Sequence, residues 1–327
     1  MSTDIARPEG SVVHAAAVYN SDAELRARAT PFLQAGLDRG EAVLAIVPAS
    51  VEQVLRSDLG GDDDRVRWQE PGLSDQCLGE AFDTFRGFFA DRHAAGEPAR
   101  LLTQNDLDGD PDRLAAYLRL EAVSTEAFAP FAYTWACLYD RRRHPPDMLA
   151  SVGQVHPQLI ADDGGLVPST SHVDPIAYLE SHPGPVSPIP ERAELDVELT
   201  APADLPATRH RLRTDAAEMG MDRHEVDSML IAVTEVVTNG LQHGRAPCRI
   251  RAWGTNHVLH VRVDDHGHSP ALAAAGYWRP TSPSSDPMGL WVARQLADVV
   301  HTQTSPNGTT VELQFRGSLP PARAMPR

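Results

Sequence analysis

Cysteine is scarce in this sequence, which has only Cys77, Cys137 and Cys248 among its 327 residues. The three are widely spaced and form no Cys-x-x-Cys pair, which excludes a disulfide framework and a zinc ribbon and fits a reducing compartment. Each is expected to act as a small buried apolar residue. Long apolar runs are also missing, since no stretch approaches the roughly 20 residues that span a bilayer. The N-terminus has no basic segment followed by an apolar one, so the sequence predicts a cytoplasmic protein.

Positive charge is in short supply too. The chain has 29 basic side chains against 45 Asp and Glu residues, a formal net charge of −16. This balance argues against a nucleic-acid groove or an anionic membrane as the partner. The basic residues are arginines, and lysine is missing altogether. The chain therefore cannot form the loop GxxxxGK[ST] with which many parallel-sheet domains bind phosphates.

The length is too great for one ordinary core and suits two domains. In the first 160 residues, apolar runs alternate with amphipathic stretches. Strands are expected at residues 14–19, 41–47, 99–103 and 131–138, helices at 22–40, around 51–55, at 77–95 and at 113–128, and an acidic loop at 62–64. Alternating strands and helices predict an α/β domain with a largely parallel sheet.

Short motifs connect this first domain to a known family. Residues 136–141 read Ala-Cys-Leu-Tyr-Asp-Arg and are followed by His156-Pro157, with His14 near the N-terminus. A strand ending in Tyr-Asp, then a loop and a helix ending in His-Pro, resembles the MEDS sensory domain, a degenerate relative of the RecA-like ATPase fold. The resemblance covers roughly residues 10 to 160. It implies binding of a small signal molecule or a partner.

His14, Cys137 and His156 are also candidates for a metal site or a ligand-sensing cluster. Nothing in their wide spacing demands a metal. The simpler expectation is that the two histidines cap or hydrogen-bond loops at strand ends. The sequence therefore predicts no metal in the first domain.

The second half is organised around residues 235–243, in which Glu235, Asn239 and His243 recur every fourth residue. On a helix this spacing rotates each side chain by only about 40°, so the three share one polar stripe. A carboxylate beside an amide suits a magnesium-nucleotide site, because the amide oxygen is a hard ligand and the carboxylate can accept a proton. The apolar residues expected on the core-facing side are Leu230, Ile231, Val233, Val236, Val237 and Leu241.

Several short elements surround this helix. A strand is expected at residues 196–200, a helix at 207–219, a cap at Asp222, and a hairpin from strands 248–253 and 257–263. Asp265 and Gly267 follow the hairpin, where a carboxylate can accept a hydrogen bond from an exocyclic amine. Residues 269–287 suit a mobile lid. A helix then starts at Gly289, where free backbone N–H groups can bind phosphate oxygens.

Four elements thus follow in order: Glu-x-x-x-Asn on a helix, Asp-x-Gly after a strand, Gly-Leu opening a helix, and Gly-Thr before the last strand at 311–315. This order resembles the N, G1, G2 and G3 boxes of the GHKL ATPase superfamily over residues 195 to 316. The amino-acid sequence of residues 235–243 and 289–297 is similar to that of the anti-sigma-factor serine kinases. The resemblance implies a Bergerat fold, an α/β two-layer sandwich with helices on one face of a mixed sheet.

The resemblance also implies roles for individual residues. Asn239 would bind Mg²⁺, Glu235 would be the general base for phosphoryl transfer, and His243 would pack near the nucleotide. The remaining nucleotide contacts would come from Asp265, Gly267, Gly289, Leu290 and Thr309. Two positions depart from the family pattern, since Ser269 and Pro287 stand where full G1 and G2 boxes have glycines. Pro287 removes an N–H that could face phosphate and so argues against efficient turnover. ATP binding is still expected.

The predicted organisation is a MEDS-like domain at residues 8–170, a proline-rich linker at 171–193 without regular structure, an ATPase domain at 194–316 and a disordered tail at 317–327. The linker stands where a histidine kinase has its dimerisation helices, which disfavours that class. The predicted function is an ATP-Mg²⁺-dependent serine/threonine kinase that phosphorylates an anti-anti-sigma (STAS) partner or binds a sigma factor. The alternative is a nucleotide-gated binding module without turnover. Anti-sigma-factor kinases resemble one another in often forming dimers, so the resemblance leaves a homodimer as a possible oligomeric state.

Overall fold

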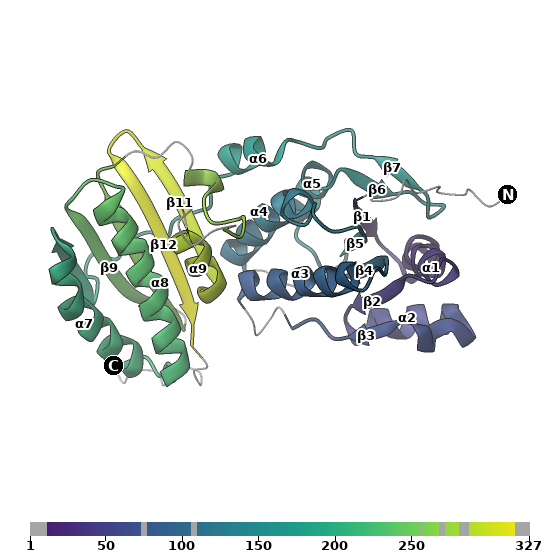
Figure 1. Cartoon of the computed structure of the whole chain (residues 1–327), viewed down its shortest axis with the longest axis horizontal. Helices are drawn as coiled ribbons and strands as arrows, with labels where there is room; N and C mark the ends of the chain where they lie inside the picture. The colour runs from purple at the N-terminus through teal and green to yellow at the C-terminus, as the bar shows by residue number, and fades with distance from the viewer. Residues whose placement is uncertain are drawn as a thin grey trace. The chain divides into compact units, whose positions relative to one another are not determined.

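The computed structural model describes residues 12–72, 77–105, 110–255, 257–267, 272–280 and 288–317. The chain divides into two compact units (Figure 1). The first comprises residues 1–76 and 81–178, and the second residues 77–80 and 179–327. The first contains a mostly parallel sheet and the second a separate antiparallel sheet with helices, which confirms the predicted α/β class. The finer boundaries at 8–170, 171–193 and 194–316 stay predictions.

The first unit is built on a seven-stranded sheet in the order β3-β2-β4-β5-β1-β6-β7. Its strands are β1 (Val13–Tyr19), β2 (Ala42–Ile46), β3 (Arg67–Gln69), β4 (Ala99–Thr103), β5 (Tyr133–Asp140), β6 (Gln158–Ile160) and β7 (Leu166–Pro168). All pairings are parallel except β6 with β7. The sequence did not predict β3, β6 and β7, because strands of three residues are too short to show a periodicity.

Helices cover both faces of this sheet. They are α1 (Asp22–Asp38), α2 (Ala49–Leu59), α3 (Leu78–Ala94), α4 (Pro111–Ala127) and α5 (Pro146–Val155). Ala15 of β1 shares an apolar cluster with Leu33 of α1 and Leu55 of α2. The opposite face carries Trp135 of β5, whose ring packs against Phe85 of α3. The stretch predicted as an acidic loop at 62–64 is instead part of a 3-10 helix, η1 (Gly60–Arg65).

The sequence had predicted no regular structure in the proline-rich segment after residue 173, and this prediction is wrong for part of it. The segment contains a short helix, α6 (Pro175–Ser181). Proline is compatible with the first helical position because the N–H it lacks has no helical partner there. The Asp174 carboxylate accepts hydrogen bonds from the backbone N–H groups of Ile176 and Ala177 and so caps the helix. Residues 183–190 that follow have no helix or strand.

The second unit has a five-stranded sheet in the order β11-β12-β10-β9-β8. Its strands are β8 (Leu195–Leu199), β9 (Cys248–Thr255), β10 (Val258–Asp265), β11 (Val299–Ser305) and β12 (Gly308–Arg316). All four pairings are antiparallel, so the mixed sheet implied by the resemblance is wrong for these strands. The hairpin predicted between β9 and β10 is present. Strand β11 was not predicted, because its second half alternates poorly in polarity.

The helices of this unit are α7 (Leu205–Glu218), α8 (Arg223–Gln242) and α9 (Met288–Leu296), with short 3-10 turns η2 (Pro202–Asp204) and η3 (Leu272–Ala274). Figure 1 shows α7 and α8 running across one face of the sheet, and α9 packs beside α8. Asp222 caps α8 as predicted: its carboxylate accepts from Glu225 N, and the Glu225 carboxylate accepts from Asp222 N.

The apolar face of α8 is largely as predicted, with one correction. Val233, Val236 and Val237 are buried in the core cluster, whereas the Ile231 side chain is 47% exposed. Ile231 lies four and eight residues before Glu235 and Asn239, and this spacing places it on the polar stripe. The spacing of Ile231 along the helix, and not its hydrophobicity, therefore determines which face of α8 it occupies.

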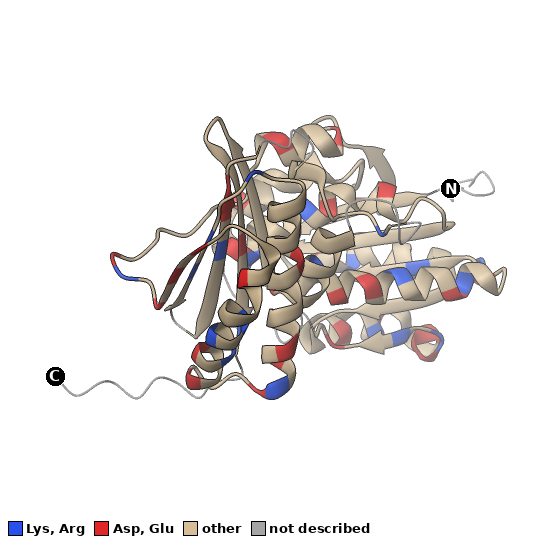
Figure 2. Cartoon of the chain, turned by 60° about the vertical axis from the view of Figure 1, so that its left-hand side comes forward, with Lys and Arg blue, Asp and Glu red and all other residues tan. Residues whose placement is uncertain are grey.

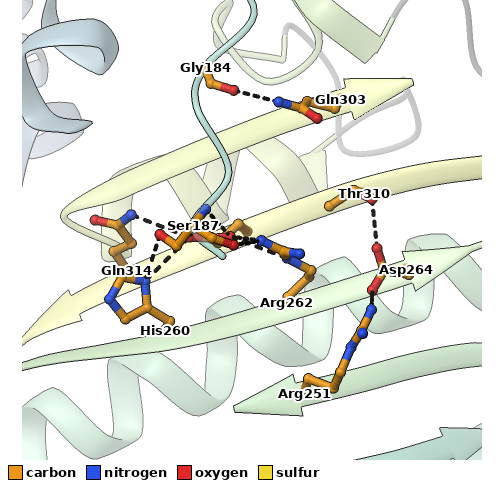
Figure 3. A network of polar contacts seen from close by, with 10 residues as sticks. Gly184, Ser187, Arg251, His260, Arg262, Asp264, Gln303, Thr310 and Gln314 are labelled. Carbon is orange, nitrogen blue, oxygen red and sulfur yellow. Dashed lines mark hydrogen bonds and ion pairs between the residues drawn. The ribbon is translucent and has the colours of Figure 1, made fainter. Parts of the chain in front are cut away.

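Residues 184–187 lie against the strands of the same unit through a polar network (Figure 3). Gly184 O accepts a hydrogen bond of 2.9 Å from the Gln303 side chain. The Ser187 backbone N–H donates to the Glu312 carboxylate at 3.0 Å, and Arg262 donates to the same carboxylate at 2.6 Å. Part of the predicted linker is thus fixed to β11 and β12.

Replacing Glu312 by glutamine is expected to change how stability depends on pH. Burial alone would raise the pKa of Glu312, but hydrogen bonds from His260, Ser187 and Arg262 outweigh it and lower the pKa to about 2. A carboxyl whose folded pKa lies below its unfolded value stabilises the fold above that unfolded value. This contribution disappears as the pH falls from about 4.5 to about 2.

For the Glu312→Gln variant, we expect a loss of about 3 kcal/mol at neutral pH and a flatter stability profile below pH 5. Urea unfolding at several pH values measures both. The exposed Glu198 of β8 provides the control, Glu198→Gln, which should resemble the parent. Identical acid profiles for parent and Glu312→Gln would show that the carboxylate is not stabilised in the fold.

Basic and acidic residues are interspersed among the described helices seen in Figure 2, with arginine in blue and acidic residues in red. Among the described residues, no helix combines the length and the apolar character that crossing a membrane requires.

Candidate nucleotide site

Glu235 and Asn239 lie one turn apart on α8, both half-buried, and converge on the first turn of α9. A Cβ placed on Gly289 would lie 2.6 Å from Asn239 Nδ2 and 3.0 Å from Glu235 Oε2. A side chain at position 289 would displace the Asn239 amide, so glycine allows α9 to approach both groups closely. The tertiary structure therefore brings together three residues that the sequence selected on separate grounds.

His243 stands at the end of the stripe. It is the C-cap residue of α8, and its backbone N–H donates to Asn239 O at 2.8 Å. The residue is exposed. Among the three predicted residues of the stripe, only Glu235 and Asn239 lie within the helix, because α8 ends one residue earlier at Gln242.

A second group of predicted residues gathers at the end of β10. Asp265 stands opposite Thr309 of β12 in the antiparallel register. The Asp265 Oδ1 atom accepts from Gly267 N at 2.6 Å, and Thr309 Oγ1 donates to Gly267 O at 3.2 Å. Among the described residues, no donor lies within hydrogen-bonding distance of the other oxygen, Oδ2. That oxygen remains able to accept a hydrogen bond from a ligand.

Two glycines that the sequence reasoning did not select connect these groups. A Cβ on Gly240 of α8 would lie 2.8 Å from Cys248 Sγ and 3.6 Å from Asp265 Oδ2. A Cβ on Gly244 would lie 2.5 Å from Asp265 Oδ1. Helix α8 thus runs directly beside the Asp265 carboxylate. Gly240 could have been found from sequence, because a glycine within a helix lowers stability and usually has a packing reason.

Cys248 is a neutral neighbour of this site. Burial, and secondly the charge of Asp265, raise the pKa of the Cys248 thiol to about 11. At physiological pH the thiol therefore stays protonated and unreactive. This agrees with the prediction that it acts as a small apolar residue.

Part of the predicted lid is packed against α9. The Arg294 guanidinium donates to Ala275 O at 3.1 Å and lies over the Tyr277 ring, 3.8 Å from its centroid. Gly276 adopts φ +78°, and a Cβ there would lie 2.6 Å from the Leu290 carbonyl carbon. Residues 275–277 are therefore packed against α9. The two departures from the family pattern, Ser269 and Pro287, lie outside the described residues.

The arrangement fits a magnesium nucleotide. Amide and carboxylate oxygens are ligands suited to Mg²⁺, and Asn239 and Glu235 carry such groups one turn apart on α8. The first turn of α9 has backbone N–H groups without helical partners at Gly289 and Leu290, which suit phosphate oxygens. Asp265 offers an acceptor, and the neighbouring glycines allow close approach of a planar ring.

Gly289→Ala is expected to lower ATP affinity while leaving the fold intact. The added methyl would push the Asn239 amide aside, and small displacements of positioned groups are costly, so we expect on the order of tenfold weaker binding. Helix propensity favours alanine, so thermal stability should not fall. Calorimetric titration with ATP and thermal unfolding measure the two effects. Gly87 of α3 has no atom within 4 Å of an added Cβ, and Gly87→Ala should bind ATP like the parent.

Two family models match the chain. Residues 13–157 match the MEDS domain, the methanogen/methylotroph DcmR sensory domain. Residues 199–315 match the histidine kinase-like ATPase domain. Comparison with curated proteins gives no match. The second match implies ATP binding and supports a kinase-type use of ATP.

Solved structures give weaker similarities. The chain is similar to the RsbU and RsbW domains of a Mycobacterium tuberculosis protein, with 22% identity over 39% of this chain and 33% of that chain and a TM-score of 0.29. It is also similar to the histidine kinase domain of the E. coli osmosensor EnvZ, with 14% identity over 42% of this chain and 98% of that chain and a TM-score of 0.25. The chain thus spans about one third of the length of the RsbU–RsbW structure.

Both family matches coincide with the resemblances that the sequence motifs indicated. The boxes at Glu235, Asp265, Gly289 and Thr309 all lie within residues 199–315. His14, Cys137 and His156 all lie within residues 13–157. The chain carries an N-terminal MEDS domain and a C-terminal histidine kinase-like ATPase domain of the GHKL type.

Proposed function

We propose that the C-terminal domain binds ATP with magnesium and transfers the terminal phosphoryl group to a serine or threonine of an anti-anti-sigma (STAS) partner, under control of the MEDS domain. The observation that carries this proposal is the convergence of Glu235 and Asn239 on Gly289, beside the group formed by Asp265, Gly267 and Thr309. The family match supports the ATP-dependent part. The identity of the acceptor rests on the similarity to anti-sigma-factor serine kinases.

Each residue has a role that its chemistry allows. Asn239 would hold the metal through its amide oxygen, and Glu235 would accept the proton of the attacking hydroxyl. When bound, magnesium would neutralise charge on the phosphates. The backbone N–H groups of Gly289 and Leu290 would hold phosphate oxygens, which places the terminal phosphoryl group near Glu235. Transfer in such a site depends mainly on positioning and charge neutralisation.

The other end of the nucleotide would be held at the end of β10. Asp265 Oδ2 would accept a hydrogen bond from the adenine amine, because Oδ1 is already engaged by Gly267 N. The Thr309 hydroxyl holds the Gly267 carbonyl in place and so keeps the backbone beneath the ring. Guanine has a carbonyl oxygen where adenine has its 6-amino group, and a carboxylate cannot donate a hydrogen bond to that oxygen, so this arrangement predicts weaker binding of GTP.

The proposal is tested with the purified full chain, labelled ATP, magnesium and a STAS-domain protein as acceptor. We expect label on the acceptor that resists acid, because phosphoserine and phosphothreonine are acid-stable whereas phosphohistidine is not. Acid-labile label on the chain itself would instead indicate histidine-kinase chemistry. ATP binding without transfer would contradict the kinase proposal and leave a nucleotide-gated module that binds a sigma factor.

A further inference from the structure

Four polar side chains meet inside the first unit, away from the nucleotide site. His14 lies on β1, Glu121 on α4, Cys137 on β5, and His156 directly after α5. All four are buried, none with more than 1% exposure. Their ligand atoms lie within 4.8 Å of one another. The sequence had predicted that the two histidines bind loops at strand ends. The structure instead turns both imidazoles toward Glu121.

The spacing of the four ligand atoms suits a tetrahedral metal site. Cys137 Sγ lies 3.6 Å from His14 Nε2 and 3.6 Å from Glu121 Oε1. Glu121 Oε2 lies 3.0 Å from His14 Nε2 and 3.5 Å from His156 Nε2. Zinc bonds of about 2.0 Å to nitrogen or oxygen and about 2.3 Å to sulfur place tetrahedral ligands roughly 3.3–3.7 Å apart. These four separations agree with this range to within a few tenths of an ångström, and all ligand atoms lie within 4.8 Å of one another.

The outer nitrogen of each imidazole is already held in place. His156 Nδ1 lies 2.9 Å from Val152 O, so it donates to that carbonyl and leaves a lone pair on Nε2. His156 Nε2 is buried, and it has no hydrogen-bond partner among the residues that the structure describes. His14 Nδ1 lies 3.1 Å from Thr125 Oγ1, and this hydrogen bond orients its ring. Hydrogen bonds of this kind orient the histidine ligands of metal sites.

Charge gives a further reason for a cation. A buried carboxylate is costly unless a positive charge accompanies it. Tyr117 donates a hydrogen bond to the Glu121 carboxylate but brings no charge. A divalent ion at the centre of the four groups would supply a positive charge beside this carboxylate.

We propose that His14, Glu121, Cys137 and His156 bind one divalent metal ion, with zinc as the preferred ion, inside the MEDS domain. One sulfur, two nitrogen and one oxygen ligands are a set that zinc accepts. Four protein ligands leave no open position, which indicates a structural or sensing role and not a catalytic one. The ion would bind as the domain folds, because the four groups have no contact with solvent.

The sequence named three of these residues as candidates, but it could not show that they meet or that Glu121 joins them. The ligands of this site come from four elements spread over more than 140 residues, and Glu121 lies in the middle of a helix with no distinguishing motif. Parallel pairing of β1 with β5 puts His14 opposite Trp135, two residues from Cys137 on the same face of the sheet. Helix α4 then brings Glu121 over that face.

The first measurement is metal content. The full chain, without an affinity tag that binds metals, is purified under reducing conditions and analysed for zinc, iron, cobalt, nickel and copper. We expect about one zinc ion per chain. Cys137→Ser and His156→Ala should lose the ion, and Cys248→Ser, at a buried cysteine of the other unit, should keep it.

A second measurement uses the parent chain alone, so it tests the proposal even if the variants do not fold. The parent chain is unfolded in the presence of a chelator, which removes the metal, and is then refolded with Co²⁺. The refolded chain should show a thiolate-to-cobalt charge-transfer band and the visible absorption bands of tetrahedral cobalt. A parent that regains its native circular dichroism, contains no metal and shows no cobalt bands would overturn the proposal. Metal retained equally by the parent and by folded Cys137→Ser and His156→Ala would overturn it too. Neither outcome depends on the kinase proposal.

Discussion

Asn239→Ala is expected to remove the magnesium dependence of ATP binding. In the parent chain, magnesium should strengthen ATP binding, because the Asn239 amide would hold the ion that bridges the phosphates. Loss of a metal ligand typically costs at least 10- to 100-fold in metal affinity. ATP affinity of the variant should therefore be the same with and without magnesium. Calorimetric titration under both conditions measures the difference.

The fold should tolerate this substitution, because Asn239 is half-buried and its side chain faces Gly289, not the apolar core. Gln242, an exposed amide at the end of the same helix, provides the matched control. Gln242→Ala should keep the magnesium dependence of the parent. If Asn239→Ala binds ATP with undiminished magnesium dependence, the ion is held elsewhere and the assigned metal ligand is wrong.

Glu235→Gln is expected to reduce phosphoryl transfer to the STAS acceptor by about 10²- to 10⁴-fold, the usual contribution of a general base. Glutamine has nearly the same shape but cannot accept the proton of the attacking hydroxyl. ATP affinity should change little, so the effect should appear in kcat and not in KM for ATP. Single-turnover transfer with labelled ATP, together with calorimetry, separates the two.

The exposed Glu218 at the end of α7 serves as the control, and Glu218→Gln should transfer at the rate of the parent. Transfer by Glu235→Gln at the parental rate would place the base elsewhere. A variant that no longer binds ATP would instead show that Glu235 has a binding role. The two substitutions on α8 thus test separate functions of neighbouring side chains.

The helices and strands that the sequence predicted best are those with a clear period or a cap. Helix α8 begins after Asp222, and strand β4 spans residues 99–103 as predicted. The short strands β3, β6 and β7 were missed, because three residues carry no usable pattern. Ile231 was placed on the wrong face because its hydrophobicity was given more weight than its spacing from Glu235.

The sequence by itself determined the two-domain α/β organisation and the order of the four nucleotide boxes, because local periodicity, capping residues and glycines are encoded within short stretches. Only the tertiary structure decided which of these residues meet. It placed Gly289 against Asn239, ended α8 before His243, and gathered His14, Glu121, Cys137 and His156 in one buried cluster. Contacts between distant residues depend on strand pairing and helix packing, and no local pattern in a single sequence specifies them.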